Sequence, residues 1–305
     1  MALADLRIAQ IQAEPGQRPL DAELDLFGLT HPGKVRKENQ DHFLLCTVHR
    51  QMVIHGTSLP ESERLPLRGE RLATIMLVAD GVGGGTGGGV ASQIAAETVT
   101  RYVATTMRCC HDAGETPDQE FHQALHAAAL EAHAAVRAIA KAQAEATGME
   151  RIRGMATTLT MVIAVWPWAY VVQVGDSRCY HFVNGELHQV TRDQTVAQDL
   201  VDRGILPRDR QSASPLSHVL ASAIGGGEAM PEVAKLDISQ RGCVIFLCSD
   251  GLTKHVSDEE IAAHLGSMES SEKACRLLLD LALERGGSDN ITILAGRARK
   301  GRPAD

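Results

Sequence analysis

The chain has 305 residues, 44% of them hydrophobic and 22% charged, which is enough apolar material to bury a substantial core. Its formal net charge of −8 at pH 7 argues against a nucleic-acid-binding protein, because such proteins need a concentrated basic face. The most apolar stretch, residues 161–174, is too short to span a bilayer and contains Pro167, so we expect neither nucleic acid nor membrane among the partners.

The first half of the chain combines short apolar runs with long helical patterns. Apolar runs predict strands at residues 25–29, 43–48 and 73–79. Residues 49–70 contain Gly, Pro, Ser and many charges, which predicts a loop. Apolar residues at helical spacing then predict helices over residues 90–107 and 118–146, the second of which is rich in alanine.

The second half of the chain mixes further strands with shorter helices. Strands are expected at residues 157–165, 169–174, 179–183, 243–248 and 291–295. Helices are expected at residues 194–203, 216–223, 258–265 and 271–284. The pair Asn184-Gly185 indicates a tight hairpin turn. Because strands and helices are grouped rather than alternating one for one, we predict an α+β fold and not a doubly wound α/β sheet.

The organisation along the chain predicts one domain with short flanking segments. We expect a loosely attached or disordered leader over residues 1–24, a single domain over residues 25–296 and a basic tail over residues 297–305. The N-terminus lacks a basic region followed by an apolar run, so no secretory signal is expected. The seven cysteines are odd in number and lack the spacing of a zinc site, which favours reduced thiols and a cytoplasmic location.

Five aspartates are the candidates for chemistry. Four of them follow apolar runs and lie beside small or turn-forming residues: Asp80, Asp176, Asp250 and Asp289. The fifth, Asp41, ends a polar segment that begins at Arg36. Singly, an aspartate before glycine is a common turn residue. Together, carboxylates at the ends of several buried strands would converge and repel one another unless cations compensate their charge.

Hard divalent cations are the expected compensation. Mg²⁺ or Mn²⁺ fits a set of carboxylates that includes no thiolate or histidine. Gly81, directly after Asp80, lets the backbone approach closely, so its carbonyl is a further candidate ligand. The residues therefore predict a carboxylate metal site, and metal-assisted hydrolysis is the leading reaction class for such a site.

Six segments carry a resemblance to a known family. They are Arg36-x-x-Asn39-Gln40-Asp41, Asp80-Gly81-x-Gly83-Gly84, Gly154-Met-Ala-Thr157-Thr158-Leu159-Thr160, Val174-Gly175-Asp176-Ser177-Arg178, Cys248-Ser249-Asp250-Gly251-Leu252 and Gly287-Ser288-Asp289-Asn290-Ile291-Thr292. In this order they resemble the motifs of the bacterial branch of the metal-dependent protein phosphatases (PPM, type 2C), over roughly residues 25–296. The resemblance implies an α-β-β-α sandwich, with two antiparallel sheets flanked by helices on both faces.

The resemblance also implies an activity, a cofactor and partners. The activity is that of a protein serine/threonine phosphatase, which hydrolyses phosphoserine and phosphothreonine by attack of a metal-bridging hydroxide. The cofactor is Mn²⁺ or Mg²⁺, two ions per site and a third in many bacterial relatives. The partners are phosphorylated proteins and a cognate serine/threonine kinase.

Individual metal-ligand roles follow from the same resemblance. Asp80 matches the residue that bridges two metal ions, and Gly81 matches the residue that gives one of them a backbone carbonyl. Asp250 and Asp289 match the ligands that complete the shell of the first metal. Asp176, together with Asp250, resembles the third-metal site.

The remaining catalytic roles are also implied by position. Asp41 would orient metal-bound water or bind a metal directly. Arg36 matches the arginine that holds the phosphate, where a guanidinium fork suits two phosphoryl oxygens. Val82 stands where animal relatives carry a histidine, and Gln40 stands where some relatives carry a glutamate. Residues 201–215 match the mobile flap of relatives, for which a plain surface connection is the alternative.

Four other interpretations stay open from the sequence. A catalytically silent phosphatase-fold module is the main alternative, although such proteins usually lose ligand carboxylates. A regulatory phosphatase that acts on antagonists of anti-sigma factors would have the same fold and chemistry. The pattern Gly83-x-Gly85-x-x-Gly88 satisfies a dinucleotide-binding motif, but no second strand with an acidic end follows it. A surface zinc site at His122, His126 and His133 is a weaker hypothesis than solvated histidines.

Overall fold

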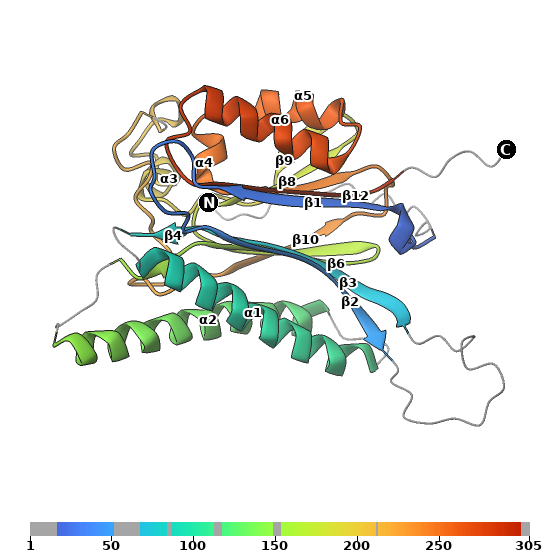
Figure 1. Ribbon diagram of the computed structural model, residues 1–305, viewed down its shortest axis with the longest axis horizontal. Helices are drawn as coiled ribbons and strands as arrows, with labels where there is room; N and C mark the ends of the chain where they lie inside the picture. The colour runs from blue at the N-terminus through green and yellow to red at the C-terminus, as the bar shows by residue number, and fades with distance from the viewer. Residues whose placement is uncertain are drawn as a thin grey trace.

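A computed structural model describes residues 17–51, 68–83, 87–112, 118–148, 154–211 and 213–299. In this part of the chain, two five-stranded antiparallel sheets pack face to face (Figure 1). The first sheet has the strand order β1 (Leu24–His31), β12 (Ile291–Ala298), β11 (Val244–Cys248), β8 (Arg178–Val183) and β9 (Glu186–Gln189). The second sheet has the order β10 (Glu232–Asp237), β7 (Trp168–Val174), β6 (Leu159–Val165), β3 (Arg68–Ala79) and β2 (His42–Gln51). A short ribbon pairs β4 (Gly81–Val82) with β5 (Ala156–Thr157).

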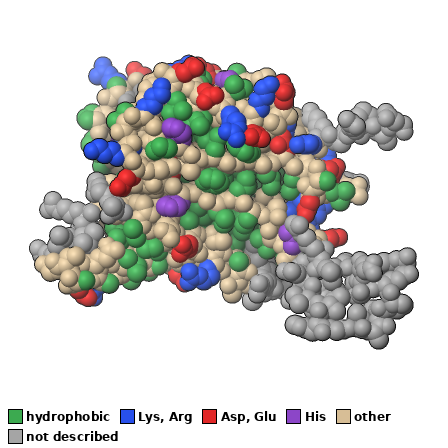
Figure 2. Space-filling view, viewed as in Figure 1, with side chains coloured by type: hydrophobic (Ala, Val, Ile, Leu, Met, Phe, Trp, Pro, Cys, Tyr) green, Lys and Arg blue, Asp and Glu red, His purple; other side chains and the backbone are tan. Residues whose placement is uncertain are grey.

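Helices cover the outer face of each sheet, which confirms the predicted α-β-β-α sandwich of the α+β class. The helices α1 (Gly87–Asp112) and α2 (Asp118–Thr147) lie on the second sheet, and α5 (Asp258–Gly266) and α6 (Ser271–Glu284) lie on the first (Figure 1). The shorter α3 (Val196–Asp202) and α4 (Asp250–Thr253) lie in connections between strands. Acidic and basic side chains are interspersed over the α5 and α6 layer (Figure 2). None of the helices in the described ranges has the length and apolar character required to cross a membrane.

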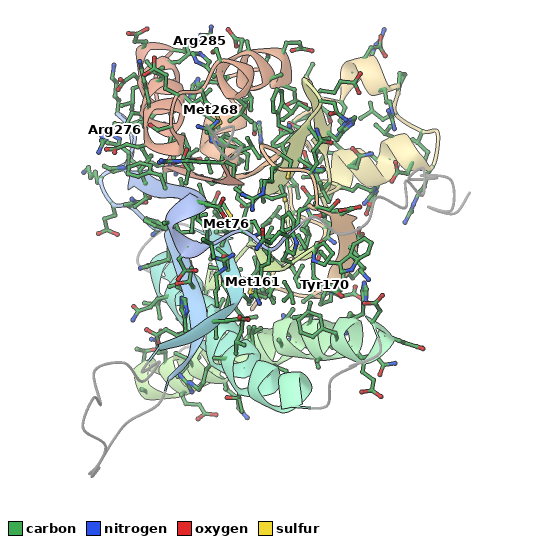
Figure 3. All side chains as sticks on the ribbon, turned by 90° about the vertical axis from the view of Figure 1, so that its right-hand side faces the viewer. Met76, Met161, Tyr170, Met268, Arg276 and Arg285 are labelled. Carbon is green, nitrogen blue, oxygen red and sulfur yellow. The ribbon has the colours of Figure 1, made fainter. Side chains whose placement is uncertain are left out.

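Three buried layers form the core, one between the sheets and one under each pair of helices. Side chains of β3 show how one strand supplies two layers: Ile75 and Leu77 pack with α1 and α2, whereas Met76 and Val78 pack between the sheets. Figure 3 shows Met76 between the two layers of sheet and Met161 nearer the α1 and α2 layer. Because successive side chains of a strand point to opposite faces, burial of both faces produces the near-continuous apolar run seen in the sequence.

The predicted leader and tail boundaries differ from the ends of the fold. The Arg71 guanidinium donates to the carbonyl of Pro19 at 2.9 Å and to Asp21 Oδ1 at 2.6 Å, so the last residues of the predicted leader pack on β3. Arg297 lies within β12 and its Nε donates to Asp25 Oδ2 at 3.0 Å, so the tail begins after this strand. Residues 1–16, 52–67 and 300–305 of the predicted leader, loop and tail lie outside the described residues.

The predicted helix over residues 216–223 is wrong. This segment forms turns and a bridge to the residues before α3 instead. The amide of Val196 donates to the carbonyl of Val219 at 2.8 Å, and the amide of Ala221 donates to the carbonyl of Gln194 at 2.9 Å. The backbone of the segment is therefore satisfied partly by its own turns and partly by a distant partner, a pairing that local periodicity does not reveal.

Besides the two-residue β4, two strands were not expected from the sequence. Asn184 and Gly185 have φ values of 54° and 86°, which fits the predicted hairpin turn, and the turn leads into β9. The strand β10 pairs with β7 at the edge of the second sheet. Both strands are short and partly exposed, so they lack the continuous apolar run that marks the central strands.

Candidate active site

The five predicted aspartates lie at one edge of the sandwich because of the antiparallel pairing. The strand β2 begins opposite the end of β3, which brings together Asp41, before β2, and Asp80, after β3. The strand β11 ends opposite the start of β12, which brings together Asp250 and Asp289 in the same way. Asp176 lies in the turn between β7 and β8. Chain reversal at one edge therefore gathers side chains that are far apart in the sequence.

Four of these aspartates line one cavity of about 520 Å³. They are Asp80, Asp176, Asp250 and Asp289, and Gly81 and Arg36 line the same cavity. Asp41 lies behind them, with 4% of its surface exposed. Its Oδ2 accepts hydrogen bonds from Ser249 Oγ at 2.9 Å and from Thr292 Oγ1 at 2.6 Å. The structure thus collects the predicted site residues into one place, with Asp41 as a buried support.

Burial and mutual repulsion make it costly to ionise all the carboxylates. Burial, followed by the charges of Asp41 and Asp250, raises the pKa of Asp80 well above its usual value. Burial, followed by the charges of Asp250 and Asp193, raises the pKa of Asp176 to about 8. Burial raises the pKa of Asp41 to about 6, against the opposing effect of its two hydroxyl donors. Positive charge in the cavity would relieve this cost.

Two basic side chains supply part of that positive charge. Arg36 Nε lies 2.8 Å from Asp289 Oδ1, and its Nη2 donates to Asp289 Oδ2 at 2.9 Å. Lys254 Nζ lies 2.7 Å from Asp250 Oδ2 and 2.8 Å from Asp289 Oδ2. Burial favours the neutral form of Asp289, but the bonds from Arg36 and Lys254 outweigh it and lower the pKa of this carboxyl. Sequence analysis missed Lys254, whose signal was its position one helical turn after Asp250.

Two carboxylate oxygens remain without a partner, and this supports a cation site. Asp41 Oδ1 and Asp250 Oδ1 are buried and accept no hydrogen bond from the residues that the structure describes. A buried carboxylate oxygen without a donor is costly, and a divalent cation would satisfy it. No three acidic, histidine or cysteine side chains within the described ranges already stand at metal-ligand spacing. Carboxylate oxygens are the donors that Mg²⁺ and Mn²⁺ prefer, so the chemistry of the site fits these ions. In the structure, Asp250 and Asp289 contact the Lys254 ammonium.

The backbone around Asp80 is held by hydrogen bonds and close packing. The Asp80 amide donates to Thr158 Oγ1 at 2.9 Å, and its carbonyl accepts from the Thr158 amide at 2.9 Å. A Cβ at Gly81 would lie 2.5 Å from the carbonyl of Gly88 and 2.6 Å from that of Gln40. Only glycine fits this position, because such distances are far inside van der Waals contact. Residues 84–86 of the glycine-rich segment 83–89 lie outside the described residues.

Asn290 fixes the loop that carries Arg36. Its Nδ2 donates to the carbonyls of Pro32 and Glu38 at 3.0 and 2.9 Å, and its Oδ1 accepts from the amide of Gln40 at 2.9 Å. This side chain is buried, so its three bonds connect the start of β12 to the loop before β2. Asp289 is therefore a candidate ligand, and the adjacent Asn290 holds the loop before β2 in place.

Comparison with known proteins agrees with this arrangement. The family model described as protein phosphatase 2C matches residues 67–282. The chain belongs to the protein phosphatase 2C family. Over 222 residues it is 33% identical to the serine/threonine protein phosphatase PstP of Mycobacterium tuberculosis, an alignment that covers 73% of this chain and 40% of PstP. It is 32% identical over 144 residues to the serine/threonine phosphatase stp of Listeria monocytogenes, covering 47% of this chain and 57% of that protein.

Solved structures of this family share the sandwich. The crystal structure of M. tuberculosis PstP/Ppp superposes with a TM-score of 0.69 at 27% identity, covering 91% of this chain and 99% of that chain. A structure of the PstP catalytic domain in complex with two manganese ions gives a TM-score of 0.65 at 30% identity, with the same coverage. The chain spans less than two thirds of the full length of the curated relatives that it matches.

The cysteines of this phosphatase 2C chain are poorly suited to act as nucleophiles. Cys179, Cys243, Cys248 and Cys275 are buried in the core. Burial raises the pKa of Cys243 and of Cys275 to about 12, so neither thiol ionises near neutral pH. None of the described cysteines lines the cavity of the aspartates. The site therefore favours attack by water over a covalent cysteine mechanism.

The helical histidines of the zinc hypothesis have other partners. His122 Nδ1 hydrogen bonds to the carbonyl of Asp118 at 2.7 Å, and its ring packs edge-on against Tyr170 at a centroid distance of 5.5 Å. His133 Nδ1 accepts from the amide of Gly225 at 3.1 Å. With His126 they do not form a metal-binding group in the part of the chain that is described. His122 and His133 therefore serve the packing of α2, and His126 is exposed on the same helix.

Proposed function

We propose that this phosphatase 2C chain is a metal-dependent protein serine/threonine phosphatase that uses Mn²⁺ or Mg²⁺. The observation that carries the proposal is the convergence of Asp80, Asp176, Asp250 and Asp289 on one cavity. Its substrates are phosphoserine and phosphothreonine in phosphorylated proteins, its opposing partner is a cognate serine/threonine kinase, and it acts in the cytoplasm. Intact candidate ligands favour the enzyme over a silent module of the same fold.

The cation-holding roles are those that the resemblance to the family implies for the residues at this edge. Asp80, Asp250, Asp289 and the carbonyl of Gly81 would hold two cations, and Asp176 with Asp250 would hold a third. When bound, such cations act as Lewis acids and supply a nucleophilic water near neutral pH. The backbone that carries these residues is held in place by the sheet pairing at the ends of β3, β11 and β12.

Asp41 and Arg36 are assigned supporting and binding roles. Asp41 receives two hydroxyl hydrogen bonds on Oδ2, and its partner-free Oδ1 is available to a ligand or to an attacking water. Arg36 is a half-exposed guanidinium on the wall of the cavity, and its fork already engages both oxygens of Asp289. The same fork would hold two oxygens of a phosphoryl group and stabilise its charge.

The direct test is hydrolysis of p-nitrophenyl phosphate after chelation and after addition of Mn²⁺. We expect turnover only with added cation, and then release of phosphate from phosphoserine and phosphothreonine peptides. Turnover that persists in chelator would contradict the metal mechanism. A folded protein that is inactive with every divalent cation tested would instead support the silent, regulatory module.

Replacing Arg36 with Ala is expected to raise the KM for a phosphopeptide by on the order of tenfold, with a smaller fall in kcat. The variant Arg36→Lys keeps a positive charge but loses the fork, so its KM is expected to fall between those of wild type and Arg36→Ala. Steady-state kinetics at saturating Mn²⁺ measure both constants. Arg276→Ala is the matched control, because Arg276 pairs with Glu272 on the outer surface of α6. An unchanged KM for Arg36→Ala would remove Arg36 from phosphate binding.

A further inference from the structure

Lys254 holds an unusual place among the candidate ligands. It lies one turn after Asp250, at the end of the short helix α4, and its side chain is 22% exposed. Its Nζ lies 2.7 Å from Asp250 Oδ2 and 2.8 Å from Asp289 Oδ2, so one ammonium bridges two carboxylates. Both carboxylates are also mostly buried, with 19% of each side chain exposed.

This bridge has a direct consequence for any cation that enters the cavity. A divalent cation held by Asp250 and Asp289 would share these two carboxylates with the ammonium, whether it binds the partner-free Asp250 Oδ1 or the Oδ2 atoms that face Lys254. Charge-assisted hydrogen bonds of this kind are stronger than neutral ones and are screened little by solvent when half-buried. Entry of the cation is therefore opposed by the Lys254 ammonium, which is held beside the same two carboxylates.

Lys37 offers an internal comparison. It lines the same cavity, but it is exposed and forms no ion pair with a described carboxylate. The two lysines have the same charge and flank the same site, and they differ in their contact with the candidate ligands. A comparison of the two lysines therefore separates the effect of a positive charge near the cavity from the effect of direct contact with Asp250 and Asp289.

We propose that Lys254 is a tethered counter-ion that competes with divalent cations for Asp250 and Asp289 and so sets the cation affinity of the site. The inference rests on the proposed function, since it assigns these two carboxylates to cation binding. Without a bound cation, the ammonium offsets one of the two negative charges of the pair, beside the Arg36 guanidinium on Asp289, and stabilises the fold. With a cation bound, the positive charge of the metal replaces that of the lysine.

The test is isothermal titration of chelator-treated protein with Mn²⁺, comparing wild type, Lys254→Met, Lys254→Arg and Lys37→Met. We expect Lys254→Met to lower the dissociation constant for Mn²⁺ by on the order of tenfold, or about 1.4 kcal/mol. Lys254→Arg keeps the charge and is expected to remain close to wild type, as is Lys37→Met. Equal affinities of wild type and Lys254→Met, or an equal gain in Lys37→Met, would overturn the proposal.

A thermal melt separates this proposal from the proposed function. In chelator, Lys254→Met is expected to melt roughly 2–4 °C below wild type, because two buried carboxylates lose their shared partner. At saturating Mn²⁺, the two proteins are expected to have the same melting temperature. If wild type binds Mn²⁺ but wild type and Lys254→Met have the same melting temperature in chelator, the counter-ion role is wrong and the metal centre is still supported. If wild type binds no Mn²⁺, the metal centre and the competition both fail, whatever the melt shows.

Discussion

Replacing Asp80 with Asn is expected to lower kcat/KM by about 10³-fold at saturating Mn²⁺, the largest effect of any conservative change in the site. Asp80 is the carboxylate on which the repulsion of its neighbours is concentrated: burial and the charges of Asp41 and Asp250 raise its pKa. The neutral amide removes one anion from this cluster and one ligand from the site. We therefore also expect Asp80→Asn, measured in the presence of chelator, to be at least as stable as wild type.

Steady-state hydrolysis of a phosphopeptide and urea unfolding in chelator measure the two effects. Asp280→Asn is the matched control, because Asp280 is exposed on α6 and lies away from the cavity. Activity of Asp80→Asn within tenfold of wild type would exclude Asp80 as a metal ligand. A marked loss of stability would show that Asp80 supports the fold rather than the chemistry.

Replacing Gly251 with Ala is expected to destabilise the protein by about 1–3 kcal/mol and to lower activity by about 10²-fold. A Cβ at Gly251 would lie 1.9 Å from the carbonyl oxygen of Asn290, a backbone atom that cannot move aside alone. The start of α4 must therefore shift away from the start of β12. That shift separates Asp250 from Asp289, and the chemistry depends on their proximity.

Urea unfolding and phosphopeptide hydrolysis again provide the readouts. Gly227→Ala is the control, because a Cβ there meets no atom within 4 Å. Wild-type activity of Gly251→Ala would mean that the contact between α4 and β12 can relax without moving the carboxylates. A loss of activity at full stability would locate the effect in the geometry of the site alone.

The sequence determined the elements whose signal is local. The apolar run of β3, the alanine-rich pattern of α2 and the Asn184-Gly185 turn predicted structure that the chain adopts. The sequence also determined which aspartates to consider, because carboxylates after buried strands are rarely explained by turn preference when several recur. The order of the motifs then led to the phosphatase 2C family and to its sandwich.

The tertiary structure decided what depends on distant partners. Residues 216–223 were expected to form a helix but pair with the segment before α3, and β10 needs the edge of β7. The ion pair between Lys254 and Asp289 joins residues 35 positions apart, so no local sequence pattern predicts it. These long-range hydrogen bonds and ion pairs depend on the sheets, which bring distant segments together. The sequence identified the candidate carboxylates, and the tertiary structure decided that Lys254 and Arg36 lie against them.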